Sequence, residues 1–308
     1  MLLSKAIEGF LLHKQVEGLS PRTLEGYKRQ LDHLAEHLGN PSLGAIEAND
    51  ILQFFDYLSN EYVPKRWSGE THALSARSKR NYWIALKSFW TWAKIDLGAA
   101  DIMDTVPAPH APTHEPNPLT EEEIQQIISA CGETADGRPH PFEHRNRAIV
   151  LALLDSGIRA TELCKLKMQD YDQRRGQIFV EGKGAKRRNV YLGNTARKML
   201  WRYLADRDNT DDPDAPLFAN QYGKPLHRHW LRRMISEIGE RANVANVHPH
   251  RFRYTFAIQY LRNQGDIFTL QRLLGHSSLK MVRYYLSLAE VDAETAHRRA
   301  SPADNWDL

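Results

Sequence analysis

Side chains that could act on a phosphate ester are concentrated towards the C-terminal end of the chain. His250 and Arg253 are three residues apart and follow Pro249, which suits the first turn of a helix because its missing N–H costs nothing there. They therefore share one face near a helix N-terminus, where free N–H groups and the helix dipole favour an anion. Gly275 can end a following helix, which places His276 at a bend. The pattern predicts a phosphate-binding site.

Two adjacent tyrosines lie on the next expected helix. At about 100° per residue, Tyr285 falls in the middle of the apolar half of this helix, whereas Tyr284 lies near its polar edge. Periodicity alone favours a structural tyrosine in the core at position 285. In combination with His250, Arg253 and His276, the same position favours a nucleophile.

The combination of His250-x-x-Arg253, Gly275-His276 and a tyrosine nine residues after that histidine resembles the tyrosine recombinase (phage integrase) family. In that family the nucleophilic tyrosine stands at this same interval. By motif the resemblance covers residues 119 to 290, while the N-terminal part matches in length and helical character.

Two further segments carry the resemblance. Ser-Gly-Ile-Arg-Ala-Thr-Glu-Leu resembles the family's first arginine box, in which Arg159 would grip phosphate and Glu162 would help to orient it. Lys183, in a Gly-Lys-Gly turn, resembles the family's hairpin lysine, with Lys186 as the alternative. Taken alone, Arg159 is more typical of a surface residue and Lys183 of an exposed basic turn.

The resemblance implies that the arginines act on a DNA phosphodiester. Guanidinium groups neutralise the charge that a nucleophile must approach, so Arg159 and Arg253 would hold the two non-bridging oxygens. His276 would add a hydrogen bond to the phosphate.

The same resemblance implies two proton transfers. A phenol has an ordinary pKa near 10, so Tyr285 needs a base, for which His250 is the candidate. Lys183 would protonate the departing 5′-oxygen. The product would be a covalent 3′-phosphotyrosine. We expect no cofactor and no metal, because the sequence shows no Gly-x-x-x-x-Gly-Lys-Ser/Thr loop and no carboxylate cluster suited to magnesium ions.

We therefore expect a DNA strand transferase, namely a site-specific recombinase or integrase. Tyr254 stands where the family usually has histidine, and Met281-Val282 replaces a frequent Thr-Thr, which favours a mobile element over chromosome dimer resolution. Two alternatives remain open at this point. A type IB topoisomerase would relax arbitrary plasmid as a monomer, and a silent DNA-binding protein would have no reason to keep all six catalytic residue types.

The elements that must position these residues fall into two domains. We expect a mainly α-helical fold with a small antiparallel β-sheet: an all-helical DNA-binding domain at 1–104, a proline-rich linker at 105–118, and an α+β catalytic domain with a C-terminal tail at 119–308. Helices are predicted in the first domain at 3–16, 21–38, 49–62 and 75–97. In the second, a hairpin of strands 177–181 and 189–192 should surround a basic turn.

The fourth helix of the first domain is rich in cations, with no acidic residue before Asp96. Its cations could meet DNA phosphates while its aromatic residues face the domain, although a solvated basic face explains them equally well. The DNA-binding candidates, which include two residues of the hairpin turn, are Arg77, Lys79, Arg80, Lys87, Lys186 and Arg187.

Composition limits the class of protein only loosely. The chain has 308 residues with 41 Lys plus Arg against 38 Asp plus Glu, so DNA contacts must come from local clustering. Cys131 and Cys164 show no metal or disulfide spacing, and no apolar run is long enough to span a bilayer. We expect a cytoplasmic protein without a membrane contact.

The resemblance implies double-stranded DNA with inverted-repeat core sites as the partner. It also implies a homotetramer on DNA, with a monomer or weak oligomer when DNA is absent. Residues 292–308 continue past the tyrosine helix and contain Trp306, which would dock on a neighbouring protomer. A frayed terminus is the alternative interpretation of this tail.

Overall fold

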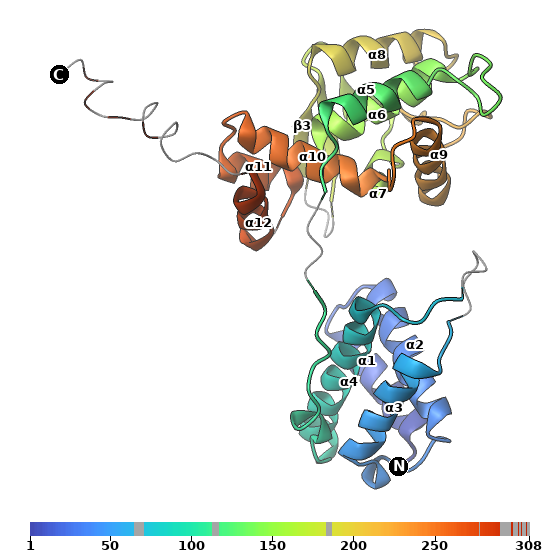
Figure 1. Ribbon diagram of the computed structural model, residues 1–308, viewed down its shortest axis with the longest axis vertical. Coiled ribbons are helices and arrows are strands. Elements are labelled where there is room, and N and C mark those ends of the chain that lie inside the picture. Colours follow the sequence, from blue (N-terminus) through green and yellow to red (C-terminus); the bar gives the residue numbers. More distant parts are fainter. Residues whose placement is uncertain are drawn as a thin grey trace. The chain divides into compact units, whose positions relative to one another are not determined.

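The computed structural model describes residues 1–64, 71–112, 117–182, 187–276 and 278–289, with only the backbone at 280 and 281, and the single positions 297, 301, 303 and 306. The chain divides into two compact units, Met1–His114 and Glu115–Leu308. Both are mainly helical, and the second contains a small antiparallel sheet (Figure 1), which confirms the expected fold class. Within the described residues, no helix is long and apolar enough to cross a membrane.

The first unit is a bundle of helices whose starts follow from their capping residues. The Ser20 side chain accepts a hydrogen bond from the Thr23 N–H, and Ser75 accepts one from Ser78. Such caps satisfy N–H groups that have no partner inside the helix. The helices, all within two residues of the predicted ends, are α1 (Leu3–Val16), α2 (Pro21–His37), α3 (Ala48–Asn60) and α4 (Ala76–Leu97). Short 3₁₀ turns, η1 (Leu43–Ala45) and η2 (Ile102–Asp104), complete the unit.

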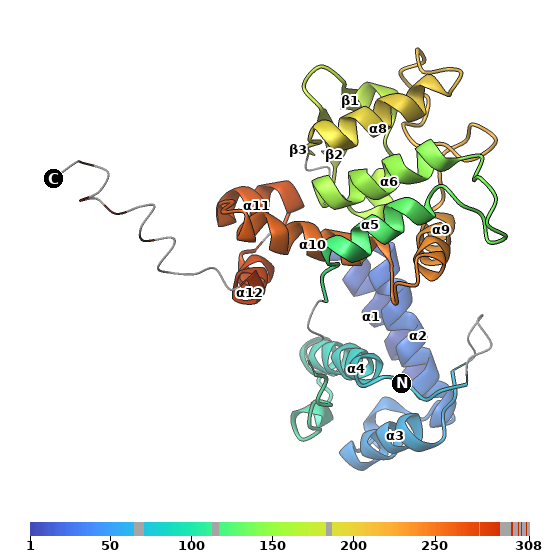
Figure 2. The same ribbon diagram turned by 45° about the horizontal axis from the view of Figure 1, so that its top comes forward.

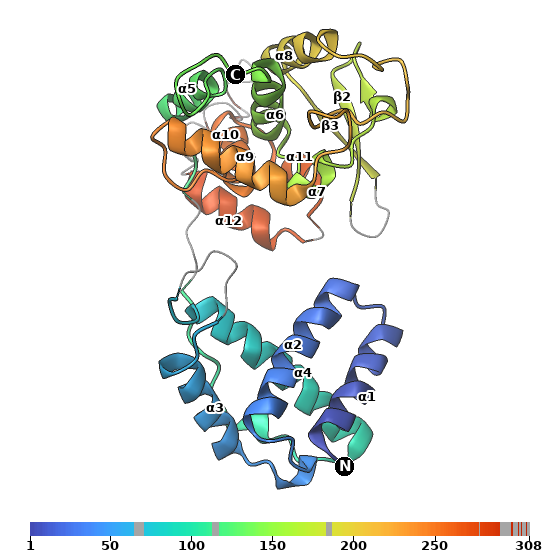
Figure 3. The ribbon, with the colours of Figure 1, turned by 90° about the vertical axis from the view of Figure 1, so that its right-hand side faces the viewer.

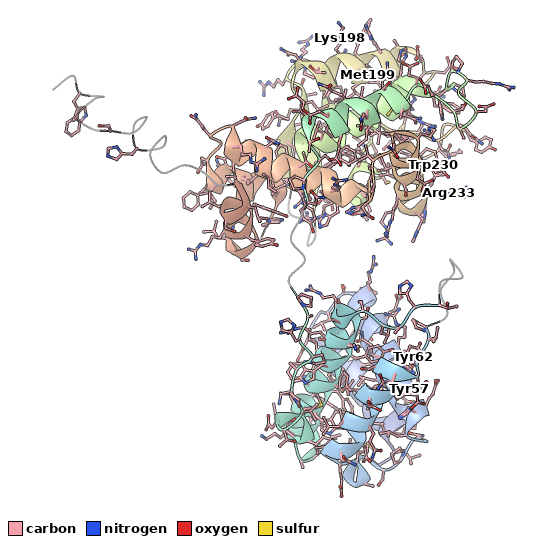
Figure 4. All side chains as sticks on the ribbon, in the orientation of Figure 1. Tyr57, Tyr62, Lys198, Met199, Trp230 and Arg233 are labelled. Carbon is pink, nitrogen blue, oxygen red and sulfur yellow. The ribbon has the colours of Figure 1, made fainter. Side chains whose placement is uncertain are left out.

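Aromatic side chains fill much of the core of this unit. Phe89 and Trp90 of α4 are fully buried, and Phe89 meets Phe10 of α1 edge to face. At the end of α3, the Tyr57 ring stacks on His37, and Tyr62 lies nearby (Figure 4). Each fully buried aromatic ring contributes about 1.5–3 kcal/mol of transfer free energy. The aromatic residues of α4 thus attach it to the bundle, as its sequence predicts.

The proline-rich segment contacts both units at its two ends. Val106 is buried in the first unit, where its carbonyl accepts a hydrogen bond from Trp83 Nε1 at 3.0 Å. In the second unit, the carbonyl of Asn117 accepts a bond from Arg251 Nε at 3.0 Å. Residues at both ends of the expected linker therefore belong structurally to the neighbouring units.

The second unit is built around α6 (Glu143–Ser156), most of whose side chains are buried. This helix packs against α8 (Asn194–Ala205) and α10 (Pro249–Arg262), as Figure 3 also shows. The other helices of the second unit are α5 (Glu121–Ala130), α7 (Ala160–Leu163), α9 (Arg228–Arg241), α11 (Ile267–Leu274) and α12 (Lys280–Ala289). The start of α5 has a capping box between Thr120 and Glu123.

The sheet of the second unit differs from the predicted hairpin in two respects. Its strands are β1 (Tyr171–Asp172), β2 (Gln177–Glu181) and β3 (Arg187–Tyr191), all antiparallel (Figure 2). The strand β1, preceded by the 3₁₀ turn η3 (Met168–Asp170), was not predicted. The second predicted strand began two residues too late, because Arg187 and Arg188 pair with Glu181 and Val180 instead of belonging to the turn. Backbone pairing and side-chain partners outweigh the low strand propensity of a basic run.

Candidate active site

The first arginine of the site follows a helix end that only glycine permits. Gly157 ends α6 with φ of 59°, and a Cβ there would lie 2.4 Å from the Phe256 ring and 2.9 Å from Leu274. The chain can therefore turn closely against α10 and α11. The turn places Arg159 at the N-terminal end of α7, where the Arg159 side chain is 37% exposed.

Glu162 orients Arg159, as the sequence predicts. The Glu162 carboxylate accepts from Arg159 Nη1 at 2.8 Å and from the Arg159 backbone N–H at 2.9 Å. Burial would raise the pKa of this carboxyl, but the hydrogen bonds from Arg188 and Arg159 outweigh it and hold the pKa below its ordinary range. Glu162 is therefore ionised and holds the guanidinium in a defined position.

Arg188 is a part of this cluster that the sequence interpretation missed. Its Nη1 and Nη2 donate to the two oxygens of Glu162 at 2.9 and 2.7 Å, and its Nε donates to the carbonyl of Leu273 at 2.7 Å. The strand pattern of the sequence could have indicated this role of Arg188. Arg188 and Val190 are two residues apart, so they share the inner face of β3, where a cation needs a carboxylate partner.

Arg253 is almost completely buried on α10. Its Nη1 donates to the carbonyl of Gly157 at 2.6 Å and its Nη2 to that of Leu274 at 2.7 Å. Burial and the charge of Arg159 lower its pKa to about 10, so the guanidinium is still a cation at neutral pH. Two backbone carbonyls therefore fix the guanidinium before any substrate binds.

His276 lies at the bend after Gly275, as expected, and contacts Arg253. Its Nε2 is 2.9 Å from Arg253 Nη2, and because a guanidinium only donates, Nε2 must accept. The proton of the neutral ring is then on Nδ1, which is buried and has no hydrogen-bond partner among the described residues. Burial and the charges of Arg253 and Arg159 lower the pKa of His276 to about 4, which favours the neutral form.

His250 lies at the start of α10 and is exposed to solvent. Its ring contacts that of Tyr254, with centroids 4.5 Å apart. Partial burial and the charge of Arg253 together lower its pKa to about 4. His250 is neutral at pH 7 and can accept a proton.

Tyr285 faces the interior, which confirms the helical-wheel prediction. It is 1% exposed, and its ring lies 6.1 Å from that of His276 and 6.0 Å from that of Tyr254. Burial raises its pKa to about 12, although the charge of Arg253 acts in the opposite direction. Tyr284 is only partly buried on the same helix. Of the two tyrosines, Tyr285 is the buried one, with its ring beside His276 and its hydroxyl influenced by the charge of Arg253.

Part of the site borders an open cleft of about 1530 Å³, whose lining does not include His250, Arg253 or Tyr285. Its lining includes Arg159, Glu162, Arg188 and His276, together with Gly182 at the end of the hairpin. Lys183 and Lys186, the two candidates for the hairpin lysine, lie outside the described residues. The structure thus brings five of the six predicted catalytic residues into one region of the second unit.

The DNA-binding candidates differ in how available their charges are. Arg77 and Arg80 are exposed on α4, and Arg187 is exposed beside the cleft. Lys79 donates to the Ser59 hydroxyl at 3.1 Å. Lys87 differs from these residues because two carboxylates neutralise its charge.

The Lys87 ammonium lies 3.1 Å from Asp101 and 2.6 Å from Asp104. The prediction of Lys87 as a phosphate contact overlooked these carboxylates, because they follow the helix in sequence and fold back onto it. The hydrogen bond that Lys87 donates to Asp104 accordingly raises the pKa of Lys87. Lys87 therefore has less charge available for a phosphate than the exposed Arg77 or Arg80.

Comparison with known proteins agrees with the geometry of the site. Residues 117–291 match the model of the phage integrase family, and residues 7–95 match the phage integrase N-terminal SAM-like domain. The chain belongs to the phage integrase family. It is 29% identical over 304 residues to the tyrosine recombinase XerC of Yersinia pestis, covering 97% of this chain and 95% of that protein. It is 30% identical over 286 residues to XerC of Escherichia coli (strain K12 / DH10B), covering 92% and 91% respectively.

A solved structure shows the same fold. The Tn1549 transposon integrase in complex with circular intermediate DNA matches with a TM-score of 0.75 at 19% identity, over 98% of this chain and 99% of that one. Family membership makes this chain a site-specific DNA recombinase, an enzyme that transfers DNA strands. Neither the topoisomerase nor the silent DNA-binding alternative is favoured.

Proposed function

We propose that the chain breaks DNA by attack of the Tyr285 hydroxyl on a phosphodiester. The bond from the tyrosine oxygen to phosphorus forms as the bond from phosphorus to the 5′-oxygen breaks, which leaves a 3′-phosphotyrosine and a free 5′-hydroxyl. Attack by the 5′-hydroxyl of another strand reverses the step and rejoins the DNA. The observation that carries this proposal is the packing of Tyr285 beside His276, whose ring accepts a hydrogen bond from the buried Arg253.

In this proposal two arginines stabilise the charge of the phosphate. Arg253 is held by two carbonyls, and Arg159 is held by Glu162. Donors fixed in this way need little reorganisation when negative charge develops on the non-bridging oxygens. His276 adds a hydrogen bond once the phosphate displaces its present contact with Arg253 and the ring proton moves from Nδ1 to Nε2.

His250 is the proposed base for Tyr285. A phenol whose pKa is about 12 is protonated at neutral pH, so its proton must leave during the attack. His250, with a pKa of about 4, is in the form that accepts it. The Tyr254 ring contacts the rings of both His250 and Tyr285. Substrate binding must therefore bring His250 and Tyr285 together. Catalytic hydrogen bonds often tighten in this way only in the substrate complex.

Lys183 is the proposed acid that protonates the departing 5′-oxygen, and Lys186 is the alternative. The support is the position of the hairpin, since Gly182 and Arg187 on either side of the turn border the cleft. A flexible ammonium near fixed guanidinium groups loses its proton more readily than a free one.

The substrate we propose is double-stranded DNA with inverted-repeat core sites, bound by a homotetramer. Exposed Arg77 and Arg80 support DNA contacts by the first unit in addition to those of the catalytic unit. We propose that the two units hold opposite faces of one duplex. If the isolated second unit bound its site as tightly as the full chain, with the same salt dependence, this arrangement would be wrong.

We propose integration or excision of a mobile element as the biological role. Tyr254 and the Met281-Val282 pair, which depart from the family pattern, support this choice over chromosome dimer resolution. A DNA substrate also supports the cytoplasmic location expected from the sequence. Selecting bound sequences from a genomic DNA pool would identify the site and test the role.

The proposed nucleophile can be tested with adjacent tyrosines. Tyr285→Phe keeps the ring but removes the oxygen, so it should bind DNA and form no covalent complex with a nicked suicide duplex. Tyr284→Phe is the matched control and should form that complex at a near-normal rate. A covalent 3′-phosphotyrosyl adduct in the Tyr285→Phe protein would falsify the assignment, and peptide mapping of the wild-type adduct would identify the true nucleophile.

A further inference from the structure

Arg188 joins three segments that come from distant parts of the chain. The residue belongs to β3, and its side chain is only 10% exposed. Its Nη1 and Nη2 donate to Glu162 on α7, while its Nε donates to the carbonyl of Leu273 at the end of α11. A planar guanidinium can make both contacts at once because its donors point in fixed, diverging directions.

Glu162 is the shared partner of the two arginines. It accepts Nη1 of Arg159 at 2.8 Å and Nη1 and Nη2 of Arg188 at 2.9 and 2.7 Å. The single negative charge of the carboxylate is shared between two guanidinium groups, so it neutralises each of them less than it would neutralise one alone. Arg159 can therefore be oriented by Glu162 and still present charge to a phosphate.

Arg188 also packs against the bend that carries His276. Gly275 has φ of 64°, and a Cβ there would lie 3.2 Å from Arg188 Cδ and 3.3 Å from its Nε and Nη1. The next carbonyl after Leu273, that of Leu274, is held by Arg253. Two arginines thus hold consecutive carbonyls immediately before the bend.

We infer that Arg188 is a positioning residue of the strand-transfer site, which fixes Glu162 and the 273–276 bend so that Arg159 and His276 meet the same phosphate. This inference rests on the proposed function and assigns Arg188 no contact with DNA. It also explains why the hairpin is placed beside the cleft, since β3 is tied to both sides of the site.

Three full-length variants test this role in single-turnover cleavage of a nicked duplex carrying the sequence selected from genomic DNA. Arg188→Met should lower the rate constant for covalent complex formation about 10- to 100-fold, by analogy with the loss of residues that orient metal ligands. Its affinity for the duplex should stay unchanged. The cleavage rate constant of Arg188→Lys should lie between those of the wild-type protein and Arg188→Met, because an ammonium cannot span Glu162 and the Leu273 carbonyl as a guanidinium does.

Arg147→Met is the matched control for loss of a structural arginine. Arg147 pairs with Glu143 and donates to the carbonyl of Ile128 at 3.1 Å, within the same unit but outside the site. This variant should lower the unfolding midpoint and the fraction of active protein, while the cleavage rate constant stays normal. If Arg188→Met behaves in the same way, Arg188 is merely structural and the inference is wrong.

The pH profile and a double-mutant cycle separate positioning from stability. Without Arg188, one cation fewer contacts Glu162, so the pKa of this carboxyl should rise. The acid limb of the rate profile should therefore move to higher pH. Arg188→Met should add little to the loss caused by Glu162→Gln, because both act on the same arrangement. Fully additive losses, or an unmoved acid limb, would overturn the inference.

The wild-type protein in the same experiment distinguishes this inference from the proposed function. Absence of any adduct at Tyr285 overturns the proposed function, and this inference with it. A normal wild-type adduct together with an unimpaired Arg188→Met protein overturns the role of Arg188 alone.

Discussion

Substituting Gly275 by alanine should damage the site more than its effect on stability indicates. The residue ends α11 with φ of 64°, a conformation that costs an L-residue roughly 1–2 kcal/mol. The new methyl group would also lie 3.2–3.3 Å from three atoms of Arg188. Because Glu162 and the Leu273 carbonyl hold that side chain, it can move away only by weakening one of these bonds.

The size of the effect follows from these two contributions. One weakened hydrogen bond costs about 1 kcal/mol, so Gly275→Ala should destabilise the second unit by about 2–3 kcal/mol. Gly223→Ala is the control in the same unit. Gly223 has φ of 72° with nothing within 4 Å of the new Cβ, so only the backbone strain of about 1–2 kcal/mol applies.

Urea denaturation would measure the stabilities, and single-turnover cleavage of the nicked duplex would measure the effect on the site. A displacement of His276 and Arg188 by a few tenths of an ångström should slow cleavage roughly tenfold in Gly275→Ala, since positioning errors of this kind are costly. Gly223→Ala should cleave at the normal rate. Equal stabilities and equal rates for the two variants would refute the reasoning.

Three further predictions concern pH, salt and assembly. Folding lowers the pKa of His276 from 6.5 to about 4, so the unfolded chain takes up its proton first as the pH falls. Stability should therefore decline between these values, and His276→Gln should flatten that decline in urea titrations at successive pH values; an identical profile would exclude the effect. Arg77→Ala should weaken DNA binding and reduce the salt slope by about one, whereas Lys87→Ala should leave the slope unchanged because two aspartates already neutralise Lys87; equal slopes in both variants would contradict this. Deleting residues 300–308 should spare DNA binding and abolish synapsis in gel-shift assays, and normal recombination by the truncated protein would rule out the tail.

Much of the fold follows from local features that the sequence displays directly. The helices predicted at 21–38 and 75–97 begin at Ser20 and Ser75, because a side-chain cap needs only the three residues that follow it. Gly157 and Gly275 end helices for an equally local reason. Helical periodicity also determined which of the two adjacent tyrosines faces the interior.

The site itself was predicted only in part, because its most informative contacts join distant segments. Motif spacing could name Arg159, Arg253 and His276, but the ring nitrogen that accepts from Arg253 is decided by a contact across 23 residues. The partners of Lys87 are 14 and 17 residues further along the chain.

Arg188 shows most clearly what the tertiary structure decided. The sequence placed it in a basic turn, whereas pairing with Val180 puts it in β3, 26 residues from Glu162 and 85 from Leu273. Local propensity and periodicity describe a residue and its near neighbours in the chain. The role of a cation depends on which carboxylates and carbonyls surround it after folding, and that is determined only when the segments pack together.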